Sequence, residues 1–199
     1  MIRRVVVTAA ALAALVPFAA AAQQWPARPV TVVVPFSPGT GMDILARTIG
    51  PRLTAMWGQP VVVENKPGAS GNIGTNFVAK APADGYTLMM GASTVVTNNA
   101  LYKDMPYNPL TDLAPIGMAA KASMLLVVHR NTGIASVREL VEKSHAKPGT
   151  FNYGSPGIGT PHHLAMEMFK ARSGADITHI PFSATGPAVT QLLGGQVPI

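Results

Sequence analysis

A glycine-rich loop between a short strand and a helix is the feature of this sequence best suited to binding chemistry. It lies within residues 150–172, where Gly157 and Gly159 precede Thr160 and Pro161. Threonine is favoured as a helix N-cap and proline at the first helical position. Such a loop leaves backbone N–H groups free where the helix dipole also favours negative charge. The stretch therefore predicts either a cradle for a carboxylate or phosphate or a tight turn without a ligand, with equal support for each.

Three more small polar loops follow apolar runs, after Pro35, Met90 and Pro181. The chain repeats an apolar strand, a short loop and a helix, which is typical of a mostly parallel sheet with helices on its faces. Ligands of such α/β folds lie at the carboxyl ends of the strands. The four loops would form one site if they share a cleft.

Hydrophobic periodicity supplies the elements that must hold these loops. Strands are expected at residues 30–35, 61–64, 86–90, 116–119, 124–128, 151–153 and 177–181. Helices are expected from Asp43 to Gly58, at 76–81, 97–102, 137–144 and 188–193, and from Pro161 onward. Ser136 and Glu139 have the spacing of a capping box. The break at residues 121–123 is the expected domain boundary.

Two titratable side chains at helix starts have alternative interpretations. Asp43 either complements the dipole of its helix or faces the cleft and accepts a hydrogen bond from a ligand or water. His162 and His163 point about 100° apart on a helix, so they cannot ligate one metal from one face. His163 is therefore expected to pack or hydrogen-bond at the loop.

Composition excludes several functions. The 199 residues contain no cysteine, so a thiolate nucleophile, a disulfide or a cysteine-ligated metal is impossible. The formal charge of +6 is not gathered into a basic run, which argues against a nucleic-acid surface. Glycines at 68, 71 and 74 do not have dinucleotide-loop spacing, and the loop before Thr160 lacks the lysine of a phosphate-binding Walker motif. No cofactor or metal is expected.

A serine hydrolase remains an alternative of a different class. Residues 91–95 read Gly-Ala-Ser-Thr-Val, which resembles a nucleophile elbow except that Val95 replaces its last glycine. The nucleophile would be Ser93, but no histidine and acid can be assigned to it by spacing. The other interpretation of Ser93 is a cap at a strand end.

The first residues have the pattern of an export signal. Arg3 and Arg4 precede an apolar run at residues 5–15, and alanines at 20–22 form a small-residue cleavage site. We expect cleavage after Ala22 and export to the periplasm. Removal of the two arginines leaves 13 basic and 9 acidic residues, a net charge of about +4.

The order of motifs resembles the Bug receptors, the substrate-binding proteins of tripartite tricarboxylate transporters. The motifs that carry the resemblance are WPARPVTVVVPFSPGTGMDILAR (25–47), GQPVVVENKPGASGNIG (58–74), ADGYTLMMG (83–91), NYGSPGIGTPHHLAMEMFK (152–170) and LLGGQV (192–197). The resemblance implies an α/β fold like that of type II periplasmic binding proteins, with two domains of mostly parallel sheet around a ligand cleft. It implies a small organic carboxylate as ligand, membrane transporter subunits as partners, a monomer and no catalysis.

The resemblance also implies which residues bind the ligand. Carried onto this sequence, the family's binding loops fall on Phe36, Ser37, Thr40, Gly41, Asp43, Ser93, Thr94, Ser155, Gly157, Gly159, Thr160, His163, Ser183 and Thr185. Thr40 replaces a glycine that is usual in the first loop, and residues 182–184 read Phe-Ser-Ala where Tyr-Lys-Gly is common.

The same comparison implies the organisation of the chain. Residues 1–22 are the expected signal peptide, 23–121 the N-terminal part of domain I, and 122–199 an incomplete domain II. Family members continue past the position of Ile199 and return to complete the first domain. We therefore expect a receptor that is incomplete at its C-terminus.

Overall fold

The valine-rich run near the N-terminus forms the central strand of a three-stranded parallel sheet. The computed structural model describes residues 25–199. In it β1 (Val30–Val34) pairs with β2 (Val61–Asn65) on one side and β3 (Thr87–Met89) on the other. A central strand has neighbours on both edges and helices over its faces, which explains why four of its five residues are buried.

The helices that follow these strands cover the first sheet. They are α2 (Gly41–Trp57), the short 3-10 turn η1 (Ala69–Gly71) with α3 (Asn72–Ala79), and α4 (Thr94–Leu101). The last two begin four and three residues earlier than the periodicity predicts. Gly58, in the left-handed conformation, ends α2 as predicted.

A second parallel sheet is formed by β4 (Phe151–Ser155) and β5 (Ile177–Pro181). It carries α5 (Val137–Ala146), α6 (Pro161–Ser173) and α7 (Thr185–Leu193), and the 3-10 turn η2 (Arg130–Thr132) precedes α5. Its core includes Leu140, Tyr153, Met166 and Ile177. The predicted capping box at the start of α5 is confirmed, because Ser136 Oγ accepts the N–H of Glu139 at 3.2 Å.

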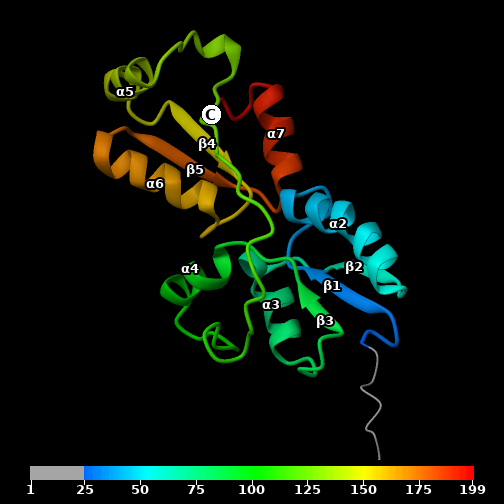
Figure 1. Cartoon of the computed structure of the whole chain (residues 1–199). Helices are drawn as coiled ribbons and strands as arrows, with labels where there is room; N and C mark the ends of the chain where they lie inside the picture. The colour runs from blue at the N-terminus through cyan, green and yellow to red at the C-terminus, as the bar shows by residue number, and fades with distance from the viewer. Residues whose placement is uncertain (1–24) are drawn as a thin grey trace, which may run out of the picture.

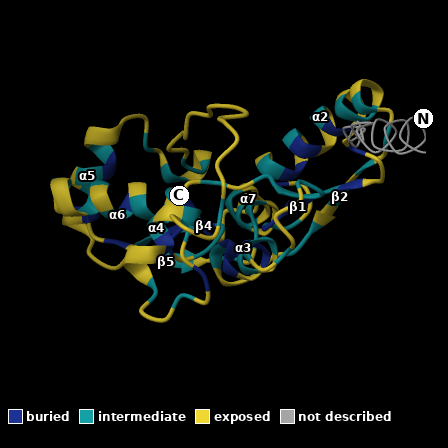
Figure 2. Cartoon of the chain, turned by 60° about the horizontal axis from the view of Figure 1, so that its bottom comes forward, coloured by how far each residue is buried: buried dark blue, intermediate teal, exposed yellow. Residues whose placement is uncertain are grey.

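The two strands predicted at residues 116–119 and 124–128 are wrong. Both segments are extended chain that runs between the two sheets, drawn as a green trace in Figure 1 and mostly exposed in Figure 2. Ile116 is 85% exposed and Leu125 83%. A β-branched or apolar run becomes a strand only where another backbone edge pairs with it, and these segments have no such partner within residues 25–199.

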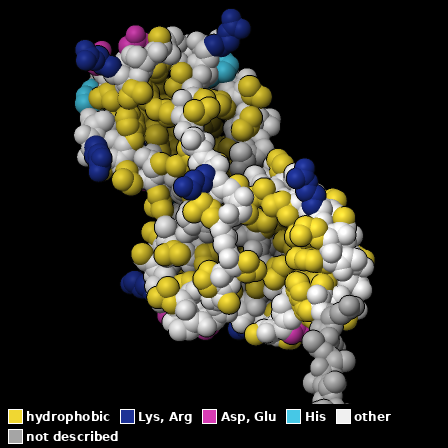
Figure 3. Space-filling view, in the orientation of Figure 1, with side chains coloured by type: hydrophobic (Ala, Val, Ile, Leu, Met, Phe, Trp, Pro, Cys, Tyr) yellow, Lys and Arg dark blue, Asp and Glu magenta, His cyan; other side chains and the backbone are white. Residues whose placement is uncertain are grey.

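Apolar side chains gather around the connecting segment, residues 116–128. The space-filling view shows them on both sides of it, with few charged side chains between them (Figure 3). The connecting segment therefore crosses an apolar part of the surface.

The carboxyl ends of both sheets face the middle of the molecule. In Figure 1 the strand arrows of the two sheets point toward the region where α2 and α7 begin. The predicted fold class, α/β with parallel sheets, is confirmed, whereas a domain boundary at residues 121–123 stays a prediction. No helix among residues 25–199 has the length and hydropathy needed to cross a bilayer. The expected signal peptide and its cleavage site at Ala22 lie outside the described residues.

Candidate functional site

The loop between β1 and α2 (residues 35–40) is held by a buried carboxylate. Asp43 is only 4% exposed, and its Oδ2 accepts the N–H of Gly39 at 2.9 Å. Its Oδ1 accepts Arg47 Nε and Asn65 Nδ2, each at 2.9 Å. The bond from Gly39 lowers the pKa of Asp43, and the Asn65 and Arg47 contacts add to this against the opposing effect of burial. Asp43 is therefore an ionised brace of the loop.

These bonds give Asp43 a structural role in the loop. Its oxygens already accept from three donors within residues 35–65, as a side chain that shapes the loop would. A direct contact with a ligand stays a prediction. Phe36 and Ser37 are half-buried, Thr40 is buried and Gly41 is exposed, so the predicted residues of this loop differ in how far a solute could reach them.

The loop between β4 and α6 (residues 156–160) is also bonded within itself. The N–H of Gly157 donates to Ser155 Oγ at 3.2 Å, and the N–H of Gly159 donates to His163 Nδ1 at 3.1 Å. The predicted N-cap is confirmed, since Thr160 precedes α6 and its Oγ accepts the N–H of His163. Two amides of the predicted cradle therefore already have acceptors.

Three aromatic rings stack behind this loop. The rings of His163 and His179 have centroids 4.4 Å apart, and His179 stacks on Tyr153 at 4.7 Å. His179 Nε2 shares a hydrogen bond of 2.7 Å with Ser155 Oγ, and Ser155 is 1% exposed. Burial lowers the pKa of His179.

An acidic side chain completes this cluster on α6. Glu167 Oε1 accepts the hydroxyl of Tyr153 at 2.7 Å and Lys170 Nζ at 2.8 Å. Burial by itself would raise the pKa of Glu167, but the bonds from Lys170 and Tyr153 lower it. Burial and the neighbouring carboxylate raise the pKa of Tyr153. The cluster therefore holds an ionised glutamate and a neutral phenol.

The β4–α6 loop lies against the first sheet's loops. Ser70 Oγ donates to the carbonyl of Ile158, and a Cβ built on Gly159 would lie 2.7 Å from Leu101 Cδ1. Asn98, 1% exposed, donates through Nδ2 to Ser70 O at 3.1 Å. The β4–α6 loop therefore meets the loop after β2 and helix α4 of the first sheet, whereas one cleft shared by the four predicted loops stays a prediction.

Strain is concentrated at this junction. Ala69 and Ser70 have φ values of 46° and 54°, in the left-handed region that glycine favours. Among the residues that the structure describes, the buried Asn98 Oδ1 has no hydrogen-bond partner, and it lies 3.4 Å from the Cβ position of Gly159. The contact between the sheets thus includes two strained residues and an unpaired buried oxygen.

The remaining predicted residues occupy the other strand ends. Ser93 is exposed and directly precedes α4, while Thr94 in the first turn is 2% exposed. Ser183 and Thr185 lie at the start of α7, and Ser183 is exposed. Within residues 25–199 the hydroxyl of Ser93 has no hydrogen bond to a histidine or a carboxylate. This geometry does not support the hydrolase alternative.

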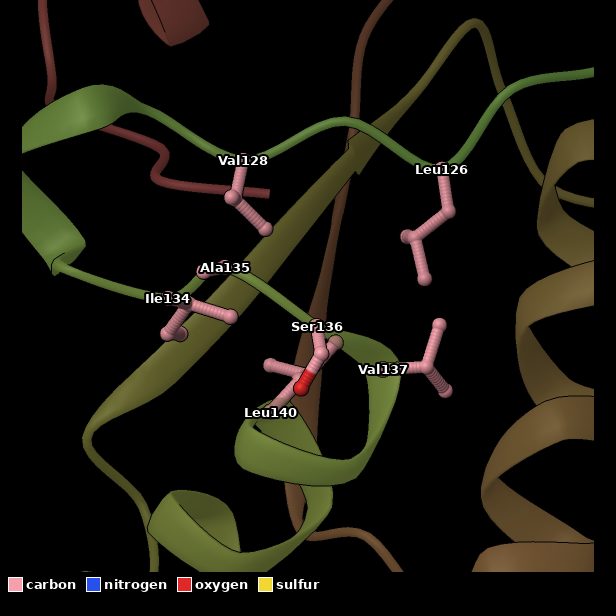
Figure 4. Close-up of a pocket in the computed structure, with 7 residues that line it drawn as sticks. All are labelled: Leu126, Val128, Ile134, Ala135, Ser136, Val137 and Leu140. Atoms are coloured by element: carbon pink, nitrogen blue, oxygen red, sulfur yellow. The ribbon is translucent and has the colours of Figure 1, made fainter.

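A hollow on the second sheet's side is separate from this site. A hollow of about 260 Å³ lies between residues 126–128 and the start of α5 (Figure 4). Its walls are apolar apart from Ser136, whose hydroxyl caps α5, and none of the predicted binding residues lines it. Within the described part of the chain no group of three His, Asp or Glu side chains is arranged to hold a metal ion.

Sequence reasoning missed several residues that shape the site. Ser70 and Asn98 connect the two sheets, and His179 supports Ser155. Ser70 lies in the second glycine loop, so the clustered glycines at 68 and 71 were the available signal. Asn98 and His179 lie on a regular helix and strand, where the sequence carries no comparable signal.

Two parallel sheets whose strands end toward one another are the arrangement of a periplasmic binding protein, and solved structures of that class are similar to this chain. Residues 45–199 match the model of the tripartite tricarboxylate transporter family receptor. Protein BugT of Bordetella pertussis is 40% identical over 178 residues, which are 88% of this chain and 55% of BugT. The chain belongs to the tripartite tricarboxylate transporter receptor family.

Solved structures give the same result. R. palustris Rpa4515 with adipate is 39% identical with a TM-score of 0.84, over 87% of this chain and 58% of that one. MatC from Rhodopseudomonas palustris with bound malate is 30% identical with a TM-score of 0.76, over 87% and 60%. This chain spans about half the length of the curated relatives it matches.

Proposed function

We propose that this chain is the ligand-binding part of a periplasmic receptor that captures a small organic carboxylate for a tripartite tricarboxylate-type transporter. The observation that carries the proposal is the meeting of the two sheets' carboxyl-end loops, where Ser70 bonds to Ile158 and Gly159 packs toward Asn98. Two related structures contain adipate and malate, which are both dicarboxylates.

Helix starts supply the positive potential for an anion. α2, α4, α6 and α7 each begin directly after a strand-end loop of the two sheets. The first N–H groups of a helix lack acceptors inside the helix and point where the dipole favours negative charge. Hydrogen bonds from such neutral donors to a carboxylate are roughly twice as strong as bonds between neutral groups. Closure of the two sheets about the connecting segment near Lys121 would then bury the ligand and present a closed surface to the membrane subunits.

Calorimetric titration with adipate and malate tests this function. We expect either acid to bind, and the matching diamide, which has no carboxylate, to bind at least tenfold more weakly. The hydrolase alternative is tested separately, since a fluorophosphonate probe should label Ser93 in a hydrolase and should leave a receptor unlabelled. Binding of the diamide as tight as that of the acid would contradict a carboxylate site.

A further inference from the structure

The β1–α2 loop and the β4–α6 loop have the same backbone turn. Gly39 and Gly159 have φ values of 80° and 79°. The next residues are N-caps with nearly equal angles, φ −74° and ψ 161° at Thr40 and φ −69° and ψ 157° at Thr160. Each threonine hydroxyl donates to the carbonyl three residues earlier, at 3.0 Å and 2.7 Å. One turn design thus occurs on both sides of the candidate site.

A side chain four residues after the glycine braces each turn. The N–H of Gly39 donates to Asp43 Oδ2 at 2.9 Å, and the N–H of Gly159 donates to His163 Nδ1 at 3.1 Å. His163 therefore occupies the place in the second turn that Asp43 occupies in the first. Because its Nδ1 accepts an N–H, the ring is neutral and carries its proton on Nε2.

The side chains one helical turn after the two braces have opposite charges. Asp43 pairs with Arg47 one helical turn later, whereas the residue one turn after His163 is Glu167. The ring of His179 from β5 lies beside His163, with Tyr153 of β4 behind it, and the carboxylate of Glu167 is on the same helix α6.

We infer that His163 is a positioning residue: its Nδ1 accepts the N–H of Gly159 and holds the β4–α6 loop in the conformation that receives the carboxylate. This inference rests on the proposed function. Loss of this acceptor leaves the Gly159 N–H without its partner and the turn without its brace, so ligand affinity falls.

Asparagine tests the acceptor itself. Its Oδ1 is attached to Cγ as Nδ1 is in histidine, so it can accept the Gly159 N–H, whereas alanine offers no acceptor. We expect His163→Ala to weaken adipate or malate binding about tenfold, which is the effect of losing one hydrogen bond. His163→Asn should restore most of the affinity.

The neighbouring histidine provides a matched control. His162 is exposed and makes no bond to the loop, so His162→Ala should keep the affinity of the unmodified protein. Equal or tighter binding by His163→Ala would overturn the inference, as would a failure of His163→Asn to restore binding.

A readout without ligand distinguishes this inference from the proposed function. In NMR spectra of the unliganded protein, the amide proton of Gly159 should shift upfield in His163→Ala, where its acceptor is lost, and should stay near its original position in His163→Asn. If that response is present but no carboxylate binds, the brace stands and the proposed function fails. If carboxylates bind but the Gly159 amide does not move in His163→Ala, the brace is refuted and the proposed function stands.

Discussion

The two glycine turns of this protein differ in what holds them and in what lies beside them. The turn after β1 is fixed by an ionised aspartate with an arginine and an asparagine around it, and a Cβ on Gly39 would meet no atom within 4 Å. The turn after β4 is fixed by a neutral histidine, and Gly159 lies against Leu101 of the other sheet's helix α4. The same backbone turn therefore leaves open space beside Gly39, whereas it places Gly159 against a helix of the other sheet.

This difference shows that backbone conformation and surroundings impose separate requirements on a glycine. Both positions need a left-handed residue, which costs roughly 1–2 kcal/mol for a side chain with Cβ. Only Gly159 must also leave room for the opposite sheet. Substitutions at the two turns, at the link between the sheets and at His179 should differ in their effects, from the largest to the smallest.

Replacement of the glycines should give the largest contrast. Gly39→Val and Gly159→Val share the backbone strain of a β-branched residue at positive φ. At residue 159 the new side chain would also push Leu101, 2.7 Å from Cβ, and separate the two sheets. We expect Gly159→Val to abolish calorimetrically measured carboxylate binding and Gly39→Val to weaken it only several-fold. Equal losses would show that the contact at Gly159 is unimportant.

Removal of the carboxylate brace should be costly in folding stability. Asp43→Ala leaves the Gly39 N–H and the Arg47 and Asn65 donors without their acceptor, so the free energy of unfolding in urea should fall by about 2–3 kcal/mol. Asp43→Asn keeps one acceptor for Gly39 and should lose less. A loss below about 0.5 kcal/mol in Asp43→Ala would show that the loop does not depend on this brace.

The hydroxyl that links the two sheets should contribute less. Ser70→Ala removes the bond to the Ile158 carbonyl and should lower the free energy of unfolding by about 1 kcal/mol. Ser70→Gly removes the same bond but also relieves the strain of a φ of 54°, so it should be the more stable of the two variants. The opposite order would show that the turn at residues 69–70 carries no strain.

The smallest effect should be a pH dependence of stability from His179. Because its folded-state pKa is lowered, mainly by burial, the unfolded chain binds the proton more readily. This contribution is fully present above the unfolded pKa of about 6.5 and is lost as the pH falls toward the folded value. His179→Phe keeps a ring beside Tyr153 but cannot titrate, so its stability should fall less between about pH 7.5 and 5.5. Parallel melting curves for the two proteins would contradict this.

The sequence indicated the elements that have strong local signals. Thr160 with Pro161 marks the start of α6, Ser136 with Glu139 marks the start of α5, and the valine run marks β1. It misjudged residues 116–119 and 124–128, because apolar composition indicates that a segment can form a strand but not whether a partner edge is present. It named the loops of the candidate site but not the contacts between them.

What the sequence determined by itself is local: the order of strands and helices, the glycine turns, the caps, and through its motifs the receptor family. These follow from backbone preferences and spacing within a few residues. The tertiary structure decided that His163 replaces Asp43 as a brace, that Glu167 stands where Arg47 stands, and that Ser70 and Asn98 bring the two sheets together. Such relations join residues up to 88 positions apart, where only the packed chain fixes distance and direction.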